Sequence, residues 1–150
     1  MAKQFEKLVI FELANNHQGD LSHADYIVRK LAEKSAGYNF NFAVKLQYRN
    51  LDTFIHPKYV DRNDVKHIPR FLSTRLNKDE FRQIVDKIKS VGLITMCTPF
   101  DEESVELCDK HGIEIIKVAS CSSNDWPLLE KVASLGKPII VSTGGKTLEQ

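Results

Sequence analysis

Five short apolar runs, separated by helical patterns, limit what this sequence can fold into more than any other feature. The runs cover residues 8–13, 42–47, 93–98, 113–120 and 138–143. Most are rich in Val and Ile and almost continuously apolar, which is typical of strands buried on both faces of a parallel sheet. Successive parallel strands need a crossover between them, usually a helix. The sequence therefore predicts a chain of βα units.

The segments between the runs carry the expected helical spacing. Two apolar faces stand out, one formed by Leu21, Ala24, Ile27, Val28 and Leu31, and the other by Phe81, Ile84, Val85 and Ile88. Asn77 followed by Glu80 resembles a capping box at the start of the second helix. Shorter helices are predicted at 101–110 and at 126–134, the latter after Asp125 as N-cap.

A weak internal repeat supports the same fold class. Gly92, Gly112 and Gly136 each stand at a predicted helix end, immediately before a strand, where glycine accepts the left-handed conformation that ends a helix. The polar 48–76 stretch interrupts this regular alternation of helix, glycine and strand. Connections of that length are usually functional or disordered.

Successive βα units allow either a doubly wound sheet or a (β/α)8 barrel. Neither GxGxxG nor GxxxxGK[ST] follows any predicted strand, which removes the main sequence support for a nucleotide-binding doubly wound fold. A (β/α)8 barrel has eight strands and about 250 residues. We therefore expect residues 1–150 to be the incomplete N-terminal portion of a TIM barrel, an α/β fold with about the first five βα units.

Composition limits the classes of binding partner, and the cellular location, that can be expected for the protein. The formal net charge is +1, with 27% charged residues, so no electrostatic argument favours nucleic acid or an anionic membrane. No apolar run approaches the roughly 20 residues of a membrane span. The N-terminal apolar stretch is too short for a signal peptide and has no small-residue cleavage site. A cytoplasmic location is the expectation.

Cysteines and most histidines give no sign of a metal site. Cys97, Cys108 and Cys121 are an odd number without CxxC spacing, and we expect reduced thiols packed in the protein. His56, His67 and His111 fall in loops or at helix ends without metal-ligand spacing, and are predicted to be solvated.

Polar residues cluster near the C-terminal ends of the five runs. They are Glu12, Lys45, Thr98, Lys117, Ser120 and Ser142. In parallel βα folds these ends share one rim, where ligands bind. Two lysines with several hydroxyls suit a phosphate or carboxylate, and the glycines of STGG (142–145) add backbone N–H groups.

Each of these residues also has a purely structural interpretation. A lysine within an apolar strand can extend its ammonium group to solvent at the strand end. Thr98 precedes a proline and could serve only a turn, Ser142 could be a satisfied core hydroxyl, and His17 could be a loop or capping histidine. Two lysines in equivalent positions favour a shared site.

Four stretches in order resemble the sialic acid synthase family. ELANNHQGD (12–20) resembles its E-I-x-x-N-H-x-G opening, and AVKLQ (43–47) resembles its second-strand A-V-K-x-Q. The other two stretches are CTPFDEESVELCDKHGIEIIKVAS (97–120) and NDWPLLEKVASLGKPIIVSTG (124–144), which resemble the family's S-T-P-F-D to K-I-x-S and N-x-P-L-L to S-T-G segments. The resemblance covers nearly the whole chain, and only 50–76 is hard to place.

The resemblance implies a (β/α)8 barrel, usually followed by a small antifreeze-like domain, that condenses phosphoenolpyruvate with an N-acetylated sugar aldehyde such as N-acetylmannosamine. The products would be a nonulosonic (sialic-type) acid and phosphate, for surface polysaccharide biosynthesis. The residues implied to bind phosphoenolpyruvate are Lys45, Thr98, Lys117, Ser120 and Ser142. Glu12 and Lys117 are the implied catalytic residues, while Asn16, His17 and Gln47 would bind substrate beside them.

Two departures from the family limit that expectation. The family uses a divalent metal, manganese or magnesium, whose histidine ligands lie beyond residue 150, so no metal ligand is expected in this segment. Ser122 also stands where the family has a glutamate. We therefore expect the 150 residues to be inactive alone.

Other functions stay open. The chain could be a non-catalytic half-barrel that binds a phosphorylated small molecule or self-assembles. It could also belong to another barrel enzyme that condenses phosphoenolpyruvate with an aldose, such as the deoxy-sugar acid synthases. Because a partial barrel leaves two sheet edges open, we expect a homo-oligomer.

Overall fold

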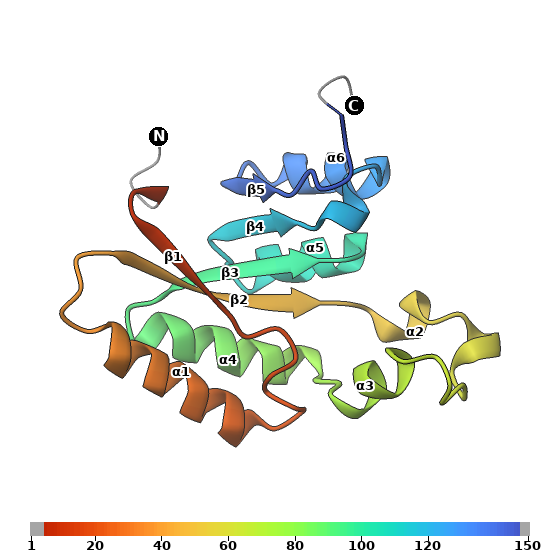
Figure 1. The fold of residues 1–150 in the computed structure, drawn as a ribbon, viewed down its shortest axis with the longest axis horizontal. Coiled ribbons are helices and arrows are strands. Elements are labelled where there is room, and N and C mark those ends of the chain that lie inside the picture. Colours follow the sequence, from red (N-terminus) through yellow and green to blue (C-terminus); the bar gives the residue numbers. More distant parts are fainter. Residues whose placement is uncertain (1–4, 148–150) are drawn as a thin grey trace.

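The computed structural model describes residues 5–147 and contains one parallel sheet with helices packed against it (Figure 1). The strands are β1 (Leu8–Glu12), β2 (Asn41–Tyr48), β3 (Ile94–Pro99), β4 (Ile115–Val118) and β5 (Ile139–Val141). The helices are α1 (Leu21–Ser35), α2 (Leu51–Phe54), α3 (Ile68–Ser73), α4 (Lys78–Ser90), α5 (Glu102–Lys110) and α6 (Trp126–Ser134), with 3-10 turns η2 (Pro57–Tyr59) and η3 (Ser120–Ser122). All five predicted strands are confirmed, with ends shifted by a few residues.

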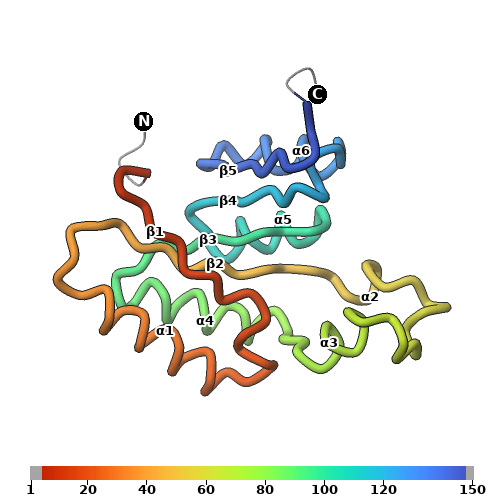
Figure 2. The backbone as a smooth tube through the Cα atoms, viewed as in Figure 1, coloured from red at the N-terminus to blue at the C-terminus, as the bar shows by residue number. Residues whose placement is uncertain are grey.

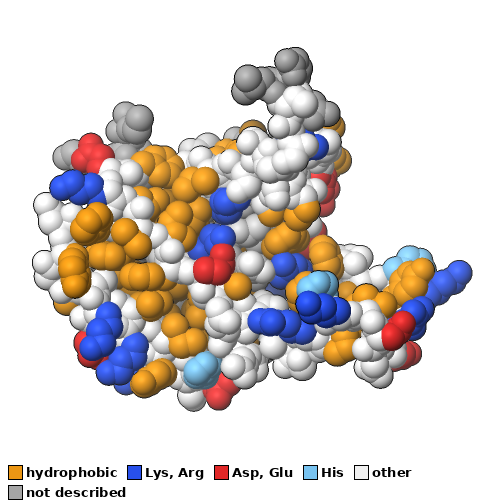
Figure 3. Space-filling view, in the orientation of Figure 1, with side chains coloured by type: hydrophobic (Ala, Val, Ile, Leu, Met, Phe, Trp, Pro, Cys, Tyr) orange, Lys and Arg blue, Asp and Glu red, His pale blue; other side chains and the backbone are white. Residues whose placement is uncertain are grey.

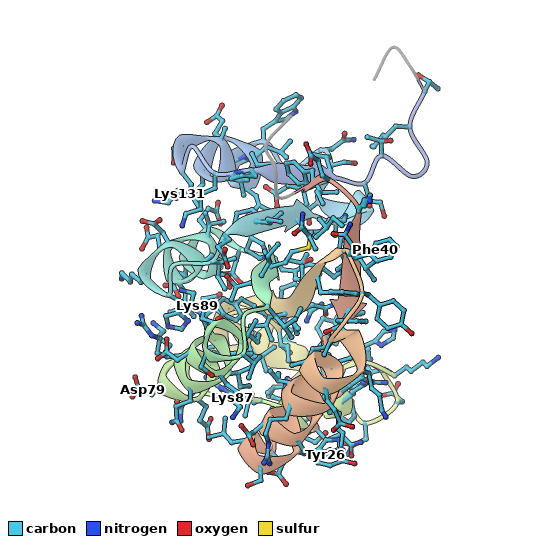
Figure 4. All side chains as sticks on the ribbon, turned by 90° about the vertical axis from the view of Figure 1, so that its left-hand side faces the viewer. Tyr26, Phe40, Asp79, Lys87, Lys89 and Lys131 are labelled. Atoms are coloured by element: carbon cyan, nitrogen blue, oxygen red, sulfur yellow. The ribbon has the colours of Figure 1, made fainter. Side chains whose placement is uncertain are left out.

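Strand order distinguishes a barrel from a doubly wound sheet. The sheet runs β1-β2-β3-β4-β5, every pair is parallel, and each strand pairs with its neighbour in the chain. A doubly wound sheet would reverse its order and carry helices on both faces. Here the helices line one side of the sheet (Figure 4). The fold is thus a partial (β/α)8 barrel, as predicted.

The helices begin and end where the sequence provides caps. Asn77 accepts a hydrogen bond from Glu80 N, while the Glu80 side chain accepts one from Asn77 N, which completes the predicted capping box of α4. Asp125 accepts from the backbone of Leu128 at the start of α6. The glycines that precede β3, β4 and β5 all have positive φ, as the repeat predicted.

Two apolar clusters show which face of the sheet packs against the helices and which face points to the interior of the partial barrel. The larger lies between the sheet and the helices and includes Val44, Leu46 and Cys97, all fully buried. The smaller lies on the opposite face and consists of Ala43, Met96 and Ile115, with partly buried neighbours. Because side chains alternate along a strand, every second residue of β2 from Ala43 points to this second face, the interior of the partial barrel.

Residues 49–77 form an excursion between β2 and α4. This segment contains α2, η2 and α3, and Figure 2 shows it extending beyond the ends of β2 and β3. It is ordered around Arg49, whose guanidinium carbon lies 3.8 Å from the centroid of Phe100, 4.6 Å from Phe71 and 5.7 Å from Phe54. The stretch that interrupts the predicted βα pattern therefore folds into short helices that project beyond the strand ends.

Two sequence-based expectations about single residues were wrong. His111 is buried, not solvated, because its ring packs edge-on to Tyr48 and its Nδ1 lies 3.0 Å from the Tyr48 hydroxyl. Cys121 is exposed within η3, whereas Cys97 and Cys108 are buried free thiols as expected. Over residues 5–147, no helix is long and apolar enough to cross a membrane.

Candidate active site

The polar residues predicted from the strand ends meet at one rim of the sheet. Glu12 is the last residue of β1 and is aligned with Lys45 of β2, while Gln47 is aligned with Thr98 of β3. Lys45 and Gln47 follow Ala43 at two-residue steps, so both belong to the barrel-interior face. Basic side chains gather around an acidic one in the middle of this face, beside a hydrophobic area (Figure 3).

Glu12 and Lys45 form an ion pair through Glu12 Oε2 and Lys45 Nζ. The Lys45 side chain is 17% exposed and that of Glu12 is 45% exposed, so the pair lies at the boundary between the sheet interior and solvent. The backbone supports it, since Leu13 N and Ala14 N both donate to Lys45 O. Glu12 is therefore held beside the lysine while its carboxylate still reaches solvent.

Lys117 of β4 supplies a second cation at the rim. Its Nζ donates to Ser142 Oγ and to Val118 O, each at 2.6 Å. Burial, reinforced by the positive charge of Lys45, lowers the pKa of the Lys117 ammonium below its usual value. No carboxylate of residues 5–147 forms an ion pair with Lys117, so an anionic ligand would relieve this repulsion.

The predicted hydroxyl residues occupy the same rim. Thr98 is 3% exposed, and Ser120 begins η3 directly after β4. A Cβ added to Gly144 would lie 3.5 Å from Ser120 Cβ, which shows that the glycine turn after β5 approaches Ser120 closely. Ser122, which the resemblance implies to stand in place of a glutamate, is buried in η3.

The ELANNHQGD loop folds back on itself in a series of tight turns. Asn16 N, Gln18 N and Asp20 N donate to the carbonyls three residues before them. Ala14 and Gln18 have positive φ values of 42° and 54°, conformations that non-glycine residues rarely adopt and that cluster at functional sites. Asp20 then caps α1 by accepting from Ser22 N and His23 N.

The two predicted substrate residues of this loop lie in different environments. Asn16 is exposed, and its Nδ2 donates to Glu12 O at 3.3 Å. His17 is 1% exposed, its Nδ1 accepts from Gly19 N at 3.0 Å, and its ring meets Phe81 edge-on. The His17 ring therefore supports the loop from beneath and does not lie on its exposed surface.

Arg49 is a rim residue that the sequence analysis missed. It continues the two-residue series of Lys45 and Gln47, and its Nη2 donates to Gln47 Oε1 at 2.9 Å. The two-residue spacing could have identified Arg49 from the sequence. The aromatic partners of Arg49 could not have been identified in this way, because they come from distant parts of the chain. Burial lowers the pKa of Arg49, although a guanidinium stays protonated in proteins.

The described residues do not fit a metal centre. No group of three or more His, Cys, Asp or Glu side chains within 5–147 lies close enough to hold an ion. The rim carboxylate, Glu12, is already paired with Lys45.

This arrangement defines a class of protein: a (β/α) barrel segment whose C-terminal rim carries a set of lysine and hydroxyl side chains. The chain belongs to the NeuB family, whose model matches residues 32–150. A Chromobacterium violaceum ATCC 12472 protein, described as a spore coat polysaccharide biosynthesis protein E, is 51% identical over 95% of this chain and 43% of its own, with a TM-score of 0.93.

Other relatives carry the names of synthases. The N-acetylneuraminic acid (sialic acid) synthetase of Leptospira borgpetersenii, solved with citrate, is 26% identical over 95% of this chain and 46% of its own, with a TM-score of 0.78. The N,N'-diacetyllegionaminic acid synthase of Campylobacter jejuni is 32% identical over 91% of this chain, which spans 42% of that enzyme. The resemblance to the sialic acid synthases is thereby confirmed.

Proposed function

We propose that the longer protein carrying this chain condenses phosphoenolpyruvate with an N-acetylated amino-sugar aldehyde, giving a nonulosonic acid and phosphate. The observation that carries the proposal is the pair of lysines at the rim, Lys45 and Lys117, of which Lys117 has no anionic partner within 5–147. The names of the Leptospira and Campylobacter relatives support the product class.

The phosphate and carboxylate of phosphoenolpyruvate suit this rim. Lys117 and Lys45 would hold these anions as point charges, and the hydroxyls of Thr98, Ser120 and Ser142 would donate hydrogen bonds to their oxygens. Because Ser142 already accepts from Lys117, the lysine is positioned before the ligand arrives. Positions fixed in advance lower the reorganisation needed as charge develops.

The bond changes of the reaction then follow from charge. The methylene carbon of phosphoenolpyruvate attacks the sugar aldehyde carbon, forming the new C–C bond while the aldehyde oxygen takes up a proton. The former enol carbon becomes cationic and is attacked by water, and the resulting intermediate expels phosphate. Glu12 would stabilise the developing positive charge or orient the water, since its carboxylate reaches solvent beside Lys45.

The sugar would enter beside the loop that follows β1. Asn16 is exposed there, and its amide can exchange the bond to Glu12 O for a sugar hydroxyl. Gln47 extends from the neighbouring strand and completes this corner. The divalent metal of the family would need ligands from outside the described residues.

Replacing Lys117 with Ala in the full-length protein tests the proposal. Losing a charge-assisted contact costs about 1.5–3 kcal/mol, so the Kd for phosphoenolpyruvate should rise about 10- to 100-fold in calorimetry. Lys137→Ala is the matched control, because that lysine pairs with Asp109 and Ile113 O before β5, at the opposite end of the strand. Equal affinity of the two variants would overturn the assignment.

A second candidate is a non-catalytic half-barrel that binds a phosphorylated molecule or assembles with itself. The observation that favours it is the exposure of apolar residues on both outer strands, including Val9 and Val141. Product formation by the full-length protein from phosphoenolpyruvate and an N-acetylated hexosamine, followed by mass spectrometry, separates the two candidates.

A further inference from the structure

The Gln47 side chain carries a free hydrogen-bond donor at the rim. Its Oε1 accepts from Arg49 Nη2 at 2.9 Å, whereas no acceptor among residues 5–147 bonds its Nε2. The Nε2 atom is not enclosed either, since the buried side-chain nitrogens without a partner in this part of the chain belong to His17 and Arg49. Gln47 lines a pocket open to solvent, together with Asn15 of the loop after β1. A ligand beside this loop can therefore reach the Gln47 NH2 group.

The direction of the Gln47 amide follows from its partner. Every hydrogen-bonding group of an arginine side chain is a donor. The Gln47 atom that faces Arg49 must therefore be the carbonyl oxygen, and the NH2 group must point the other way. The two ends of a glutamine amide have nearly the same shape, so rotation about the last side-chain torsion exchanges them at little cost. Arg49 thus decides which end of the amide a ligand meets.

Arg49 can set this direction because three aromatic rings fix its own position. Its guanidinium carbon lies 3.8 Å from the ring centroid of Phe100 and 4.6 Å from that of Phe71. Phe54 meets both of these rings edge-on, with centroids 6.3 Å and 6.1 Å away. Rings above a guanidinium restrict its plane and leave the N–H groups at its edge free to donate. The arginine is therefore held in place before Gln47 bonds to it.

We propose that Arg49 is a positioning residue, which holds the Gln47 amide with its NH2 group towards the rim and thereby selects a substrate atom that accepts a hydrogen bond. This inference rests on the proposed function, in which Gln47 faces the amino sugar. A carbonyl oxygen of the N-acetylated sugar meets the requirement. A group that can only donate, such as an ammonium, does not, because it would leave two buried donors facing each other.

Two other roles for Arg49 lead to different expectations. An arginine that binds phosphoenolpyruvate directly would affect the affinity for that substrate first, but Arg49 Nε is buried and Nη2 is engaged by Gln47. An arginine that only anchors the segment 49–77 would affect both substrates equally, whatever residue stands at position 47. A positioning residue affects the sugar alone, and only while Gln47 is present.

A double-mutant cycle on the full-length protein tests whether Arg49 acts through Gln47. Arg49→Met removes the donors and keeps an unbranched chain between the rings. It should raise the KM for the N-acetylated amino sugar about 2- to 10-fold, the cost of ordering one freed side chain, and change the KM for phosphoenolpyruvate by less than about 2-fold. Added to Gln47→Met, it should raise the KM for the sugar no further.

The control for this cycle is Arg75→Met. Arg75 lines the same pocket, but both of its terminal nitrogens bond the Asp52 carboxylate, so neither KM should change. Effects of Arg49→Met and Gln47→Met that multiply in the double variant would overturn the proposal. A rise in the KM for phosphoenolpyruvate as large as that for the sugar would overturn it as well.

Gln47→Glu tests the direction of the amide while leaving Arg49 and its rings intact. The glutamate keeps an oxygen for Arg49 Nη2, so the variant should fold like the parent. It replaces the NH2 donor with an acceptor, which should raise the KM for the sugar about 10-fold or more. An unchanged KM for the sugar would show that the substrate atom at Gln47 is not an acceptor.

Crystal structures of the full-length protein show the amide position without reference to activity. The parent and Arg75→Met should hold the Gln47 side chain in one conformer, and Arg49→Met should show more than one. A single, unchanged Gln47 conformer in Arg49→Met would overturn the positioning role. If the conformers change as expected but the parent forms no product from phosphoenolpyruvate and the amino sugar, the proposed function is the part that fails.

Discussion

Single residues in the loop after β1 carry conformations that the rest of the chain must hold in place. Gly19 has a φ of 75°, and a Cβ added there would lie 3.1 Å from Ser73 O. The loop after β1 thus packs closely on the end of α3. This contact connects the two segments that flank the rim, namely the loop after β1 and the excursion between β2 and α4.

Gly19→Ala should lower the free energy of unfolding by about 1–3 kcal/mol, because it combines left-handed backbone strain with that contact. Gly37→Ala is the matched control, since Gly37 has a φ of 88° but nothing within 4 Å of an added Cβ. Urea unfolding of both variants gives the comparison. Equal losses would contradict the close packing of the loop on α3.

Buried histidines make stability depend on pH. Burial is the main cause that lowers the pKa of both His17 and His111 below 6.5. The unfolded chain therefore binds more protons than the folded one between the lowered pKa values and 6.5. The contribution of these two histidines to the free energy of unfolding should be fully present above pH 6.5 and should be lost as the pH drops through that window.

Urea midpoints at pH 7.5 and pH 5.0 measure this effect. The double variant His17→Gln, His111→Gln should lose less stability on acidification than the parent protein. His67→Gln should behave like the parent, because His67 is exposed. An unchanged pH response in the double variant would show that other groups dominate acid unfolding.

At the scale of elements, local signals predicted helices and strands well. Apolar spacing, caps and glycines are properties of neighbouring residues, so the ends of α4 and α6 could be read directly. The burial of His111 could not, since it depends on Tyr48, 63 residues away. The cage around Arg49 likewise joins Phe54 of α2, Phe71 of α3 and Phe100, which follows β3.

The same distinction holds for the candidate site. Which residues stand at strand ends follows from sequence, and the structure indeed pairs Glu12 with Lys45 and Lys117 with Ser142. The inward burial of His17 does not follow, because it arises from the turns between Leu13 and Asp20 and from the contact with Phe81.

Asn77→Ala should destabilise the protein by about 1 kcal/mol, since it removes the side-chain acceptor that caps Glu80 N at the start of α4. Asn63→Ala, in an exposed loop, should change the free energy of unfolding by less than about 0.5 kcal/mol. Chemical unfolding followed by circular dichroism compares the two. A loss at Asn77 no larger than at Asn63 would mean that packing alone holds the helix start.

At the scale of the whole molecule, the sheet has two open edges. Val9 and Ile10 on β1 are 36% and 38% exposed, and Ile139 and Val141 on β5 are 37% and 48% exposed. Unpaired strands of this kind associate readily. The 150-residue chain prepared alone should therefore form oligomers that dissociate on dilution.

Light scattering over a concentration series checks this expectation. Val141→Lys, which charges the β5 edge, should shift the chain towards the monomer, whereas Val65→Lys, on an exposed site outside the sheet, should not. A monomer at all concentrations with a cooperative melt would refute the prediction.

The sequential order of the strands also bears on how the protein is made. Each strand pairs with the one synthesised just before it. Contacts of short sequence separation form quickly, and N-terminal regions fold first during synthesis. This part of the barrel can therefore assemble unit by unit as it leaves the ribosome.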